Sequence, residues 1–541
     1  MTQATNAMLL QALEMMQEGR AGGRVVPNIA ALRKLPAQGS LNVVVLGREK
    51  IGDNDGGVYW QDIHDKTSAD NGYTVIVAQD GMRWKLAPPS GTSTEADGVS
   101  VLKYGAIGDG KHDDSAAIQK ALDQNKGGTI LIPEGRYLHS GVKLDGPSYN
   151  GTKIICRGEM LLRPRKAERE ANLQGAFIGL LIRDCENIEV HYRGDGNRKS
   201  QPVQEHCFNV AVAGAKNVRF PTFFCKEVRG DAVYITQSNL HQASPLAEKI
   251  YFGKFDVENS EDDGRNAMSI ISGKDIVVDD FRSVRVGGKV NVMQPGGFDI
   301  EPNTDFQIVD NVWLKKVYID TAGNFGLQCF GQARNRLGGN VSNLRVDDFD
   351  VRTRCDGRSS ALVCFRHCRN IVLKGRAVMA NPNDAHHVGL MLDNVDGAQI
   401  DIEVKGGLFA ALASYSYQVN KAVVNLTATE YRRAALTTAH VSNSDFKVKA
   451  INGGRRSSAL YTRSWGSKWS SGKAIQSNTV YQIDSPQNTT RGDAGVINDT
   501  LHGVEFKGVS FSGGNLTGYA KDKAMVGFGN KVRLKSVRGI M

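Results

Sequence analysis

The sequence predicts an all-β protein whose main body is a parallel β-helix, preceded by a small β-rich domain. Three patterns lead to this fold class. Apolar residues alternate with a period of two, short strands that begin with Asn or Asp recur every 26 to 36 residues or so, and strands that begin with a small residue alternate with them. Repeats of this length made only of short strands indicate a solenoid. The period of two excludes helical solenoids, and a propeller would need four strands in each repeat.

The first 97 residues are expected to form a helix and a small β-rich domain. Residues 4–17 place Leu9, Leu13 and Met16 on one helical face, which either packs against the core or docks on a partner chain. The polar run 88–98 has the composition of a linker. Between them, strands are expected at 42–46, 58–60, 73–77 and 82–86, with hairpin signals at 71–72 and 80–81.

Residues 101–138 begin the main body. Asp114 or Ser115 can cap a helix over residues 114–124. Strands follow at 129–132 and 136–138, separated by a Pro-Glu-Gly turn. We expect this helix to close one open end of the β-helix. One face of it is lined by Ala117, Ile118, Ala121 and Leu122.

Two kinds of strand then alternate along the chain, and residues at equal places in successive repeats should form columns about 4.8 Å apart. The first kind begins at Asn187, Asn217, Lys249, Asp275, Asn311, Asn343 and Asn370. The second kind begins with a small residue, at Ala232, Ala267, Gly297, Gly326, Ala361 and Gly389.

Composition excludes several classes of protein. The 541 residues include 67 Lys and Arg against 57 Asp and Glu, a net charge of +10. This excess is spread along the chain, which fits a solvated surface or attraction to an acidic polymer such as a uronic-acid polysaccharide, and not a nucleic-acid-binding tail. The N-terminus lacks the pattern of a signal peptide, and no apolar run is long enough to span a membrane.

The eight cysteines form no CxxC pair, and the nearby histidines complete no zinc pattern. No metal or other cofactor is therefore predicted. Several of these cysteines lie in apolar, strand-like runs, which predicts buried free thiols and folding in a reducing cytoplasm.

Two segments resemble known families. The segment 101–138 closely resembles the start of the right-handed β-helices of the pectate-lyase-like superfamily, and 28–86 looks like the small N-terminal domain found ahead of such β-helices in bacteriophage tailspikes. The first resemblance lies in Tyr104-Gly105-Ala106, Gly108-Asp109-Gly110, Asp113-Asp114, Ala117-Ile118-Gln119, Gly127-Gly128-Thr129 and the run from Ile132 to Tyr137. The second lies in the runs Ile29 to Arg33, Asp55 to Tyr59, Asp70 to Gly72 and Gly81 to Lys85.

The resemblance implies a homotrimer that binds, and often cleaves, bacterial capsule or lipopolysaccharide chains. Such a protein is made in the host cytoplasm, is carried on the virion tail and acts outside the cell, without nucleic-acid partners or membrane insertion. Residues 1–97 are then expected to attach to a phage tail or baseplate protein, and 98–440 to form the β-helix. Residues 441–541 form either further coils or a separate C-terminal module.

The stretch GGFDIEPN, residues 296–303, holds the candidate catalytic pair. Phe298 and Ile300 share one face of the expected strand, and Asp299 and Glu301 share the other. If the apolar pair points into the coil, the two carboxylates point out, roughly 6.6 Å apart at the backbone. Aligning the repeats adds polar and aromatic side chains to the same outward strip, as sugar binding requires. The aligned residues are Tyr234, Ser269, Gln328, Val363 and Met391 beside Asp299, and Phe330, Phe365 and Asp393 beside Glu301.

Glycoside hydrolysis needs two carboxyl groups, one protonated and one ionised, and mutual repulsion separates their pKa values. The spacing of Asp299 and Glu301 lies near the boundary between retaining and inverting geometries, and the longer reach of Glu favours inversion. A second acidic cluster lies one coil earlier, where Asp262 and Asp263 could supply a further carboxylate and Arg265 a substrate-binding cation. The same cluster contains Glu258 and Glu261, and weaker acidic candidates, Glu227 and Asp231, lie one coil earlier again.

Two other functions stay open. A lyase on the same fold would need a cation and a base, for which Arg265, Tyr234 and His386 are candidates, with His387 beside the last. The net positive charge favours a lyase, and the paired carboxylates disfavour it. The third possibility is an adhesin that binds the polysaccharide without cleaving it.

The linker predicts that the N-terminal block takes no part in the chemistry. A chain that begins at Gly98 should therefore stay trimeric and cleave polysaccharide at the full-length rate, as measured by light scattering and release of reducing ends. Loss of the trimer or of activity in the shortened chain would show that this division is wrong.

Overall fold

The computed structural model describes residues 24–35, 42–51, 53, 56–62, 65–72, 74–86, 98–166, 176–288, 296–332, 337–353, 361–379, 388–454, 457–463, 474–485, 496–498, 504–516, 525–526, 532–535 and 538. The chain divides into two compact units. The first comprises residues 1–121, 129–138 and 156–159, and the second comprises 122–128, 139–155 and 160–541. The expected helix at residues 4–17 and most of the expected linker lie outside the described residues.

The N-terminal part of the first unit is a five-stranded sheet, in the order β1-β2-β3-β5-β4. Its elements are β1 (Arg24–Val26), α2 (Ile29–Leu32), β2 (Asn42–Val45), β3 (Gly57–Asp62), β4 (Val75–Val77) and β5 (Arg83–Leu86). The predicted strands are present, and Gly81 takes a positive φ in the turn between the antiparallel strands β4 and β5. Buried Val43, Tyr59, Ile76 and Trp84 form the core.

Short elements connect this sheet to the coils. They are β6 (Val99–Ser100), η2 (Val101–Tyr104), β7 (Asp109–Asp113), α3 (Ser115–Gln124), β8 (Thr129–Ile132) and β9 (Arg136–His139). Ile118, Ala121 and Leu122 of α3 are buried, as the apolar pattern predicted. The carboxylate of Asp114, just before α3, accepts hydrogen bonds from the backbone N–H groups of Ile107 and Gly108 at 2.7 and 3.0 Å.

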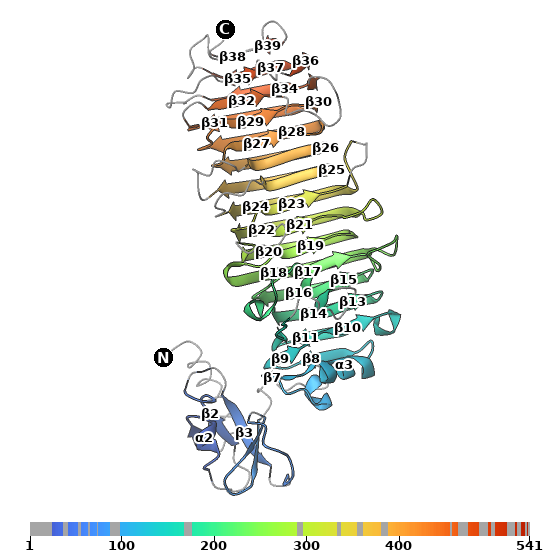
Figure 1. Cartoon of the computed structure of the whole chain (residues 1–541), viewed down its shortest axis with the longest axis vertical. Helices are drawn as coiled ribbons and strands as arrows, with labels where there is room; N and C mark the ends of the chain where they lie inside the picture. Colours follow the sequence, from blue (N-terminus) through green and yellow to red (C-terminus); the bar gives the residue numbers. More distant parts are fainter. Residues whose placement is uncertain are drawn as a thin grey trace. The chain divides into compact units, whose positions relative to one another are not determined.

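The described strands from β10 to β39 form a right-handed parallel β-helix, seen in Figure 1 as a stack of coils. One column of strands contains β10 (Val142–Asp145), β13 (Phe177–Arg183), β15 (Cys207–Ala213), β17 (Asp231–Thr236), β19 (Asn266–Ile270), β21 (Gly296–Ile300), β23 (Phe325–Phe330), β27 (Phe409–Ala413), β29 (Ala434–Thr438), β32 (Ser458–Thr462), β35 (Val496–Asn498) and β38 (Met525–Val526). Each strand pairs in parallel with the equivalent strand of the next coil, for example β17 with β19 and β19 with β21.

A second column contains β11 (Lys153–Cys156), β14 (Glu186–Asp195), β16 (Lys216–Lys226), β18 (Ala247–Asp263), β20 (Gly273–Val286), β22 (Val309–Thr321), β24 (Val341–Thr353), β28 (Val419–Thr429), β31 (Asp445–Ile451), β34 (Val480–Asp484), β37 (Ser510–Asn515) and β39 (Arg533–Lys535). Two long strands, β25 (Ala361–Met379) and β26 (Val388–Lys405), run through both columns. Shorter elements are η3 (Pro147–Tyr149), β12 (Glu159–Leu162), η4 (Arg198–Ser200), β30 (Val441–Ser442), β33 (Ile475–Ser477) and β36 (Glu505–Lys507).

The recurring Asn and Asp residues mark the bend that enters the second column. All seven residues named in the first repeat, including Lys249, take φ between 52 and 59°. Asn and Asp tolerate this left-handed region better than other residues with a side chain. Their side chains also bond from coil to coil, since Asn217 Nδ2 donates to Asn187 Oδ1 at 2.7 Å and Asn311 Nδ2 to Asp275 Oδ1 at 2.6 Å.

The interior of the coils is filled by stacked apolar side chains. Phe223, Phe255 and Phe281 are fully buried in successive coils, with ring centroids 4.8 and 4.7 Å apart. The seven cysteines among the described residues are free and buried, as predicted. Among the described residues, no helix is long and apolar enough to cross a membrane.

The strands described beyond residue 441 continue the stack. β31 pairs in parallel with β34, β34 with β37 and β37 with β39. Phe446, Tyr481 and Phe511 stack inside these coils, with successive ring centroids 5.4 Å apart. These described strands are therefore further coils of the β-helix.

Candidate functional site

The strand register brings most of the predicted strip together. Tyr234, Ser269, Asp299 and Gln328 pair in that order across β17, β19, β21 and β23. Phe298 and Ile300 are fully buried inside the coil, as predicted. The alignment of the repeats is therefore correct over these four coils.

The alignment is wrong by one residue in β25. Gln328 pairs with Cys364 and not with Val363, and Cys364 in turn pairs with Met391. Because a shift of one residue moves a side chain to the opposite face, Phe365 points into the coil beside Cys329 and is fully buried. The prediction that Phe365 binds substrate is wrong for this reason, and Arg366 takes the outward position instead.

The two predicted catalytic carboxyls differ in accessibility. The side chain of Glu301 is 19% exposed, but Asp299 is fully buried, contrary to the expectation that both face solvent. Asn266 Nδ2 lies 3.4 Å from Asp299 Oδ2, and Gln328 Nε2 lies 3.3 Å from Asp299 Oδ1. These amides from the coils on either side cover Asp299, so Glu301 is the member of the pair that a substrate can reach.

Arg265, which the sequence analysis proposes as a binding cation, forms ion pairs with three carboxylates. Its Nη1 donates to Asp231 Oδ2 at 2.7 Å, its Nη2 lies 3.9 Å from Glu301 Oε2, and its Nε lies 3.8 Å from Glu205 Oε2. One nearly buried guanidinium thus joins a buried carboxyl to two accessible ones. Glu205 was missed because it lies in the connection before β15, where no strand alternation or repeat position marks it.

Arg265 is the one cation of this group of side chains, and the four carboxyl groups around it are those of Asp231, Asp299, Glu205 and Glu301. Burial raises the pKa of Asp299 well above its usual range, the charge of Glu301 raises it further, and Arg265 opposes both effects. Burial also raises the pKa of Asp231, although Arg265 favours its charged form. The surroundings therefore favour the protonated forms of the two buried carboxyls, Asp231 and Asp299.

Tyr234 lies at one side of this cluster. Its ring stacks on Phe208 with centroids 4.2 Å apart and planes 8° from parallel. Burial raises the pKa of Tyr234, and the charge of Asp231 raises it further. The phenol therefore stays protonated at neutral pH, as a hydrogen-bonding group and not as a base.

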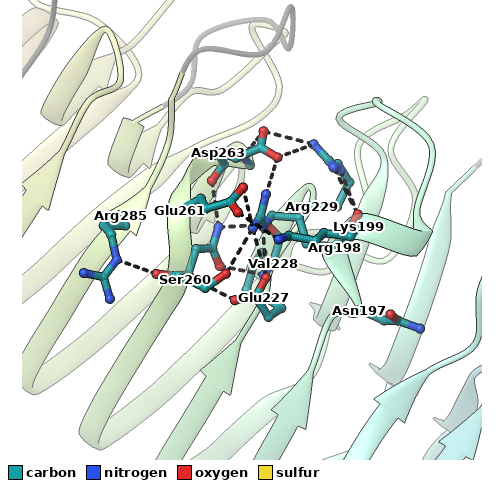
Figure 2. Close-up of polar contacts among 12 residues, drawn as sticks. Asn197, Arg198, Lys199, Glu227, Val228, Arg229, Ser260, Glu261, Asp263 and Arg285 are labelled. Carbon is teal, nitrogen blue, oxygen red and sulfur yellow. Dashed lines mark hydrogen bonds and ion pairs between the residues drawn. The ribbon is translucent and has the colours of Figure 1, made fainter.

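Asp263 belongs to a separate ion-pair network (Figure 2). Arg198 donates to Asp263 and lies 3.0 Å from Glu227, while Arg229 Nη1 lies 3.0 Å from both oxygens of Asp263. Arg229 also donates to the backbone oxygen of Arg198 at 3.0 Å. Both oxygens of Asp263 are thus occupied by buried guanidinium groups, and this network holds the chain around η4 in place.

The other acidic candidates are also engaged. Glu258 pairs with Arg282 and Arg285, and Glu261 pairs with Lys199 at the exposed edge of the network. Asp262 is half-buried in β18. His386 and His387 lie outside the described residues. We therefore place the candidate site around Arg265 and Glu301, and not on Asp262 or Asp263.

Phe330 is half-buried one coil beyond Glu301. The guanidinium of Arg366 lies 4.7 Å from its ring centroid, and the ring of His367 meets it edge-on at 6.0 Å. Phe330 therefore supports Arg366 and is not a bare platform for a sugar ring. Among the described residues, no group of three or more His, Cys, Asp or Glu is arranged to hold a metal ion.

Two family models match the chain. Residues 25–88 match the phage tail protein small four-stranded β-sheet domain, and residues 98–160 match the pectate-lyase-like rhamnogalacturonase A/epimerase family. These are the two segments singled out in the sequence, and the matches confirm the resemblance of the first to a phage tail domain and of the second to the pectate-lyase-like superfamily. The chain has a phage tail β-sheet domain followed by a pectate-lyase-like β-helix.

Solved structures resemble the chain at low identity and low TM-score. Gene product 12 of bacteriophage phi29 is 13% identical over 78% of this chain and 68% of its own, with a TM-score of 0.39. A capsular polysaccharide depolymerase tailspike of Acinetobacter baumannii bacteriophage Fri1 is 13% identical over 96% and 76%, with a TM-score of 0.25. An exopolygalacturonase of Thermotoga maritima is 12% identical over 76% and 91%, with a TM-score of 0.31.

A curated relative covers only a short stretch. Plasmin and fibronectin-binding protein A of Streptococcus pneumoniae is 50% identical over 48 residues. This match spans 8% of the chain and only 7% of that protein's length, so nothing about activity follows from it.

The geometry predicts that Asp263 contributes to stability and not to catalysis. Asp263→Asn would leave two buried guanidinium groups without their shared counter-charge, and should lower the free energy of unfolding by about 3–5 kcal/mol. Guanidinium chloride unfolding monitored by fluorescence measures this loss. Glu261→Gln, at the exposed edge of the same network, is the control and should change stability little. A stable Asp263→Asn protein with lost activity would reverse this assignment.

The raised pKa of Asp299 predicts how stability depends on pH. Because the folded protein holds this proton more tightly than the unfolded chain, the contribution to stability is complete at low pH and is lost as the pH rises through the folded pKa. Asp299→Asn cannot ionise, so its Tm should fall less than that of the wild type as the pH rises from about 4, the ordinary pKa of Asp, through the raised folded pKa. Calorimetry across the pH range tests this, and parallel curves for the two proteins would contradict it.

Proposed function

We propose that the protein is a phage tailspike that hydrolyses glycosidic bonds in a bacterial surface polysaccharide. Glu301 and Glu205, on either side of Arg265, supply the two carboxyl groups that meet the substrate. The observation that carries this proposal is the nearly buried guanidinium of Arg265, within 4 Å of both accessible carboxylates. Glycoside hydrolysis uses a pair of carboxyl groups with different protonation.

The buried residues of the site prepare this pair. Asp231 fixes the Arg265 guanidinium at 2.7 Å, and burial together with the charge of Glu301 raises the pKa of Asp299, which favours its protonated form. Asp299 is thus a positioning residue that limits the negative charge around Glu301. The amides of Asn266 and Gln328 keep Asp299 in place from the neighbouring coils.

The site favours hydrolysis over β-elimination. A lyase needs a group that removes a proton from the sugar, and the sequence offered Tyr234, Arg265 and His386, of which the described residues include the first two. The pKa of Tyr234 is raised, and the charge of Asp231 raises the pKa of Arg265 although burial opposes this, so both hold their protons at neutral pH. Neither is suited to act as a base.

The N-terminal domain supports a place on the virion tail. Residues 25–88 match a phage tail protein domain, which fits attachment of the β-helix to a tail or baseplate protein. We expect the assembled protein to be a homotrimer that acts outside the host cell.

Substitution of the accessible carboxyls tests the proposed chemistry. Glu301→Gln and Glu205→Gln keep size and hydrogen bonding but cannot transfer a proton, so each should lower kcat by at least about 100-fold. The assay is release of reducing ends from capsule and O-antigen preparations. Asp299→Asn should lower kcat less, because Asn resembles the protonated side chain.

The control is Glu403→Gln, an exposed glutamate of β26 outside the site, which should keep full activity. Wild-type activity in both Glu301→Gln and Glu205→Gln would reject the site. Binding of a polysaccharide without any cleavage by the wild type would identify an adhesin.

A further inference from the structure

A second charged group lies on the same outward column as Glu301. Ile300 pairs with Cys329 and Phe330 pairs with Arg366, which in turn pairs with Asp393. Arg366 is therefore two coils beyond Glu301, a distance of about 10 Å along the stack. A polysaccharide that crosses Glu301 along the coil axis would reach Arg366 within a few sugar residues.

Arg366 is held by a carboxylate that is itself fixed by the backbone. Its Nε lies 3.2 Å from Oδ2 of the fully buried Asp393. Oδ1 of Asp393 accepts hydrogen bonds from the N–H groups of Tyr415, Ser416 and Tyr417 at 3.1, 2.9 and 2.7 Å. These bonds fix Asp393, whose Oδ2 forms an ion pair with Arg366 Nε without a hydrogen bond between the two atoms.

Aromatic rings set the orientation of the guanidinium. Its central carbon lies 4.7 Å from the ring centroid of Phe330 and 5.9 Å from that of Tyr417. His367 braces both rings edge-on, at 6.0 Å from Phe330 and 5.0 Å from Tyr417, and its Nδ1 bonds to Asn394 at 2.8 Å. This packing restricts the rotamers of Arg366, whereas an arginine that is only solvated at the surface keeps its conformational entropy.

The outer edge of Arg366 is open. The side chain is 25% exposed, and no described residue accepts a hydrogen bond from its two terminal nitrogens. A guanidinium held in this way presents two parallel N–H groups, the geometry that matches a carboxylate. The same column thus carries a catalytic carboxylate and, two coils away, a receptor for an anion.

We propose that Arg366 binds the carboxylate of an acidic sugar in the polysaccharide, and so makes the protein selective for acidic chains. This inference rests on the proposed function, since it places the anionic sugar beside the bond that Glu301 cleaves. It assigns the substrate class as a polysaccharide whose repeat contains a uronic or other carboxylated sugar.

The test compares an acidic capsular polysaccharide that the wild type cleaves with the same polymer after its carboxyl groups have been reduced to alcohols. Loss of a charge-assisted, bidentate contact should raise the KM of the wild type for the reduced polymer roughly tenfold, with kcat largely kept. Arg366→Gln should show the raised KM on the native polymer and no further rise on the reduced one. Arg366→Lys, which keeps the charge beside Asp393 and guards against misfolding, should fall between them.

Arg376→Gln is the matched control, because Arg376 lies in the same strand, pairs with Asp350 and is remote from the outward column. Its KM should be unchanged. Equal discrimination between the two polymers by wild type and Arg366→Gln would overturn the proposal, as would a wild type that cleaves only neutral polysaccharides. Binding of both polymers to the inactive Glu301→Gln protein, measured by biolayer interferometry, tests the subsite even if the assignment of Glu301 fails.

Discussion

The in-register stacking of each coil on the next is the constraint from which the rest of the structure follows. Parallel pairing places equivalent residues of successive coils side by side, which turns a weak sequence repeat into continuous columns. Inside the coils, the parallel pairing stacks phenylalanine rings on one another. At the bend before the second column, it brings the side-chain amides of Asn187 and Asn217 into hydrogen-bonding distance. On the outward face it collects residues from β17 to β26 that are up to about 160 positions apart in the sequence. The site therefore depends on the register of the strand pairing, because a shift of one residue in that pairing would turn its side chains to the opposite face.

Within that frame, the electrostatics of the site depend on Arg265. A single guanidinium cannot neutralise Asp231, Asp299, Glu205 and Glu301 together, and two of these carboxyls are fully buried. Burial raises the pKa values of Asp231 and Asp299, which favours their protonated forms and lowers the negative charge around Arg265. The network around Asp263 also consists of Arg and acidic side chains, but its arginines Arg198 and Arg229 are balanced by Asp263 and Glu227. We therefore expect this network to stabilise the fold.

The sequence was sufficient for the fold and for part of the site. The repeat of Asn and Asp identified the coils because the left-handed bend restricts which residues fit, and the alternation at Phe298 and Ile300 placed Asp299 and Glu301 on one face. Burial was not predictable in this way: the amides that cover Asp299 come from neighbouring coils. Phe365 was misplaced because Ala361-Leu362-Val363-Cys364 resembles Gly326-Leu327-Gln328-Cys329 when the first residues are aligned, and the true register is one residue different. Glu205 lies in a connection, where no periodicity exists to reveal it.

The central claim is hydrolysis of a polysaccharide, and the masses of the products test it most directly. Capsule or O-antigen fragments released by the protein would be reduced with borohydride to fix their ends and then weighed by mass spectrometry. Hydrolysis predicts saturated oligosaccharides, each heavier by one water than the repeat units it contains before reduction, with no new ultraviolet absorbance from a C=C bond. Unsaturated fragments lacking that water, accompanied by such absorbance, would contradict the account and show that the site acts by elimination.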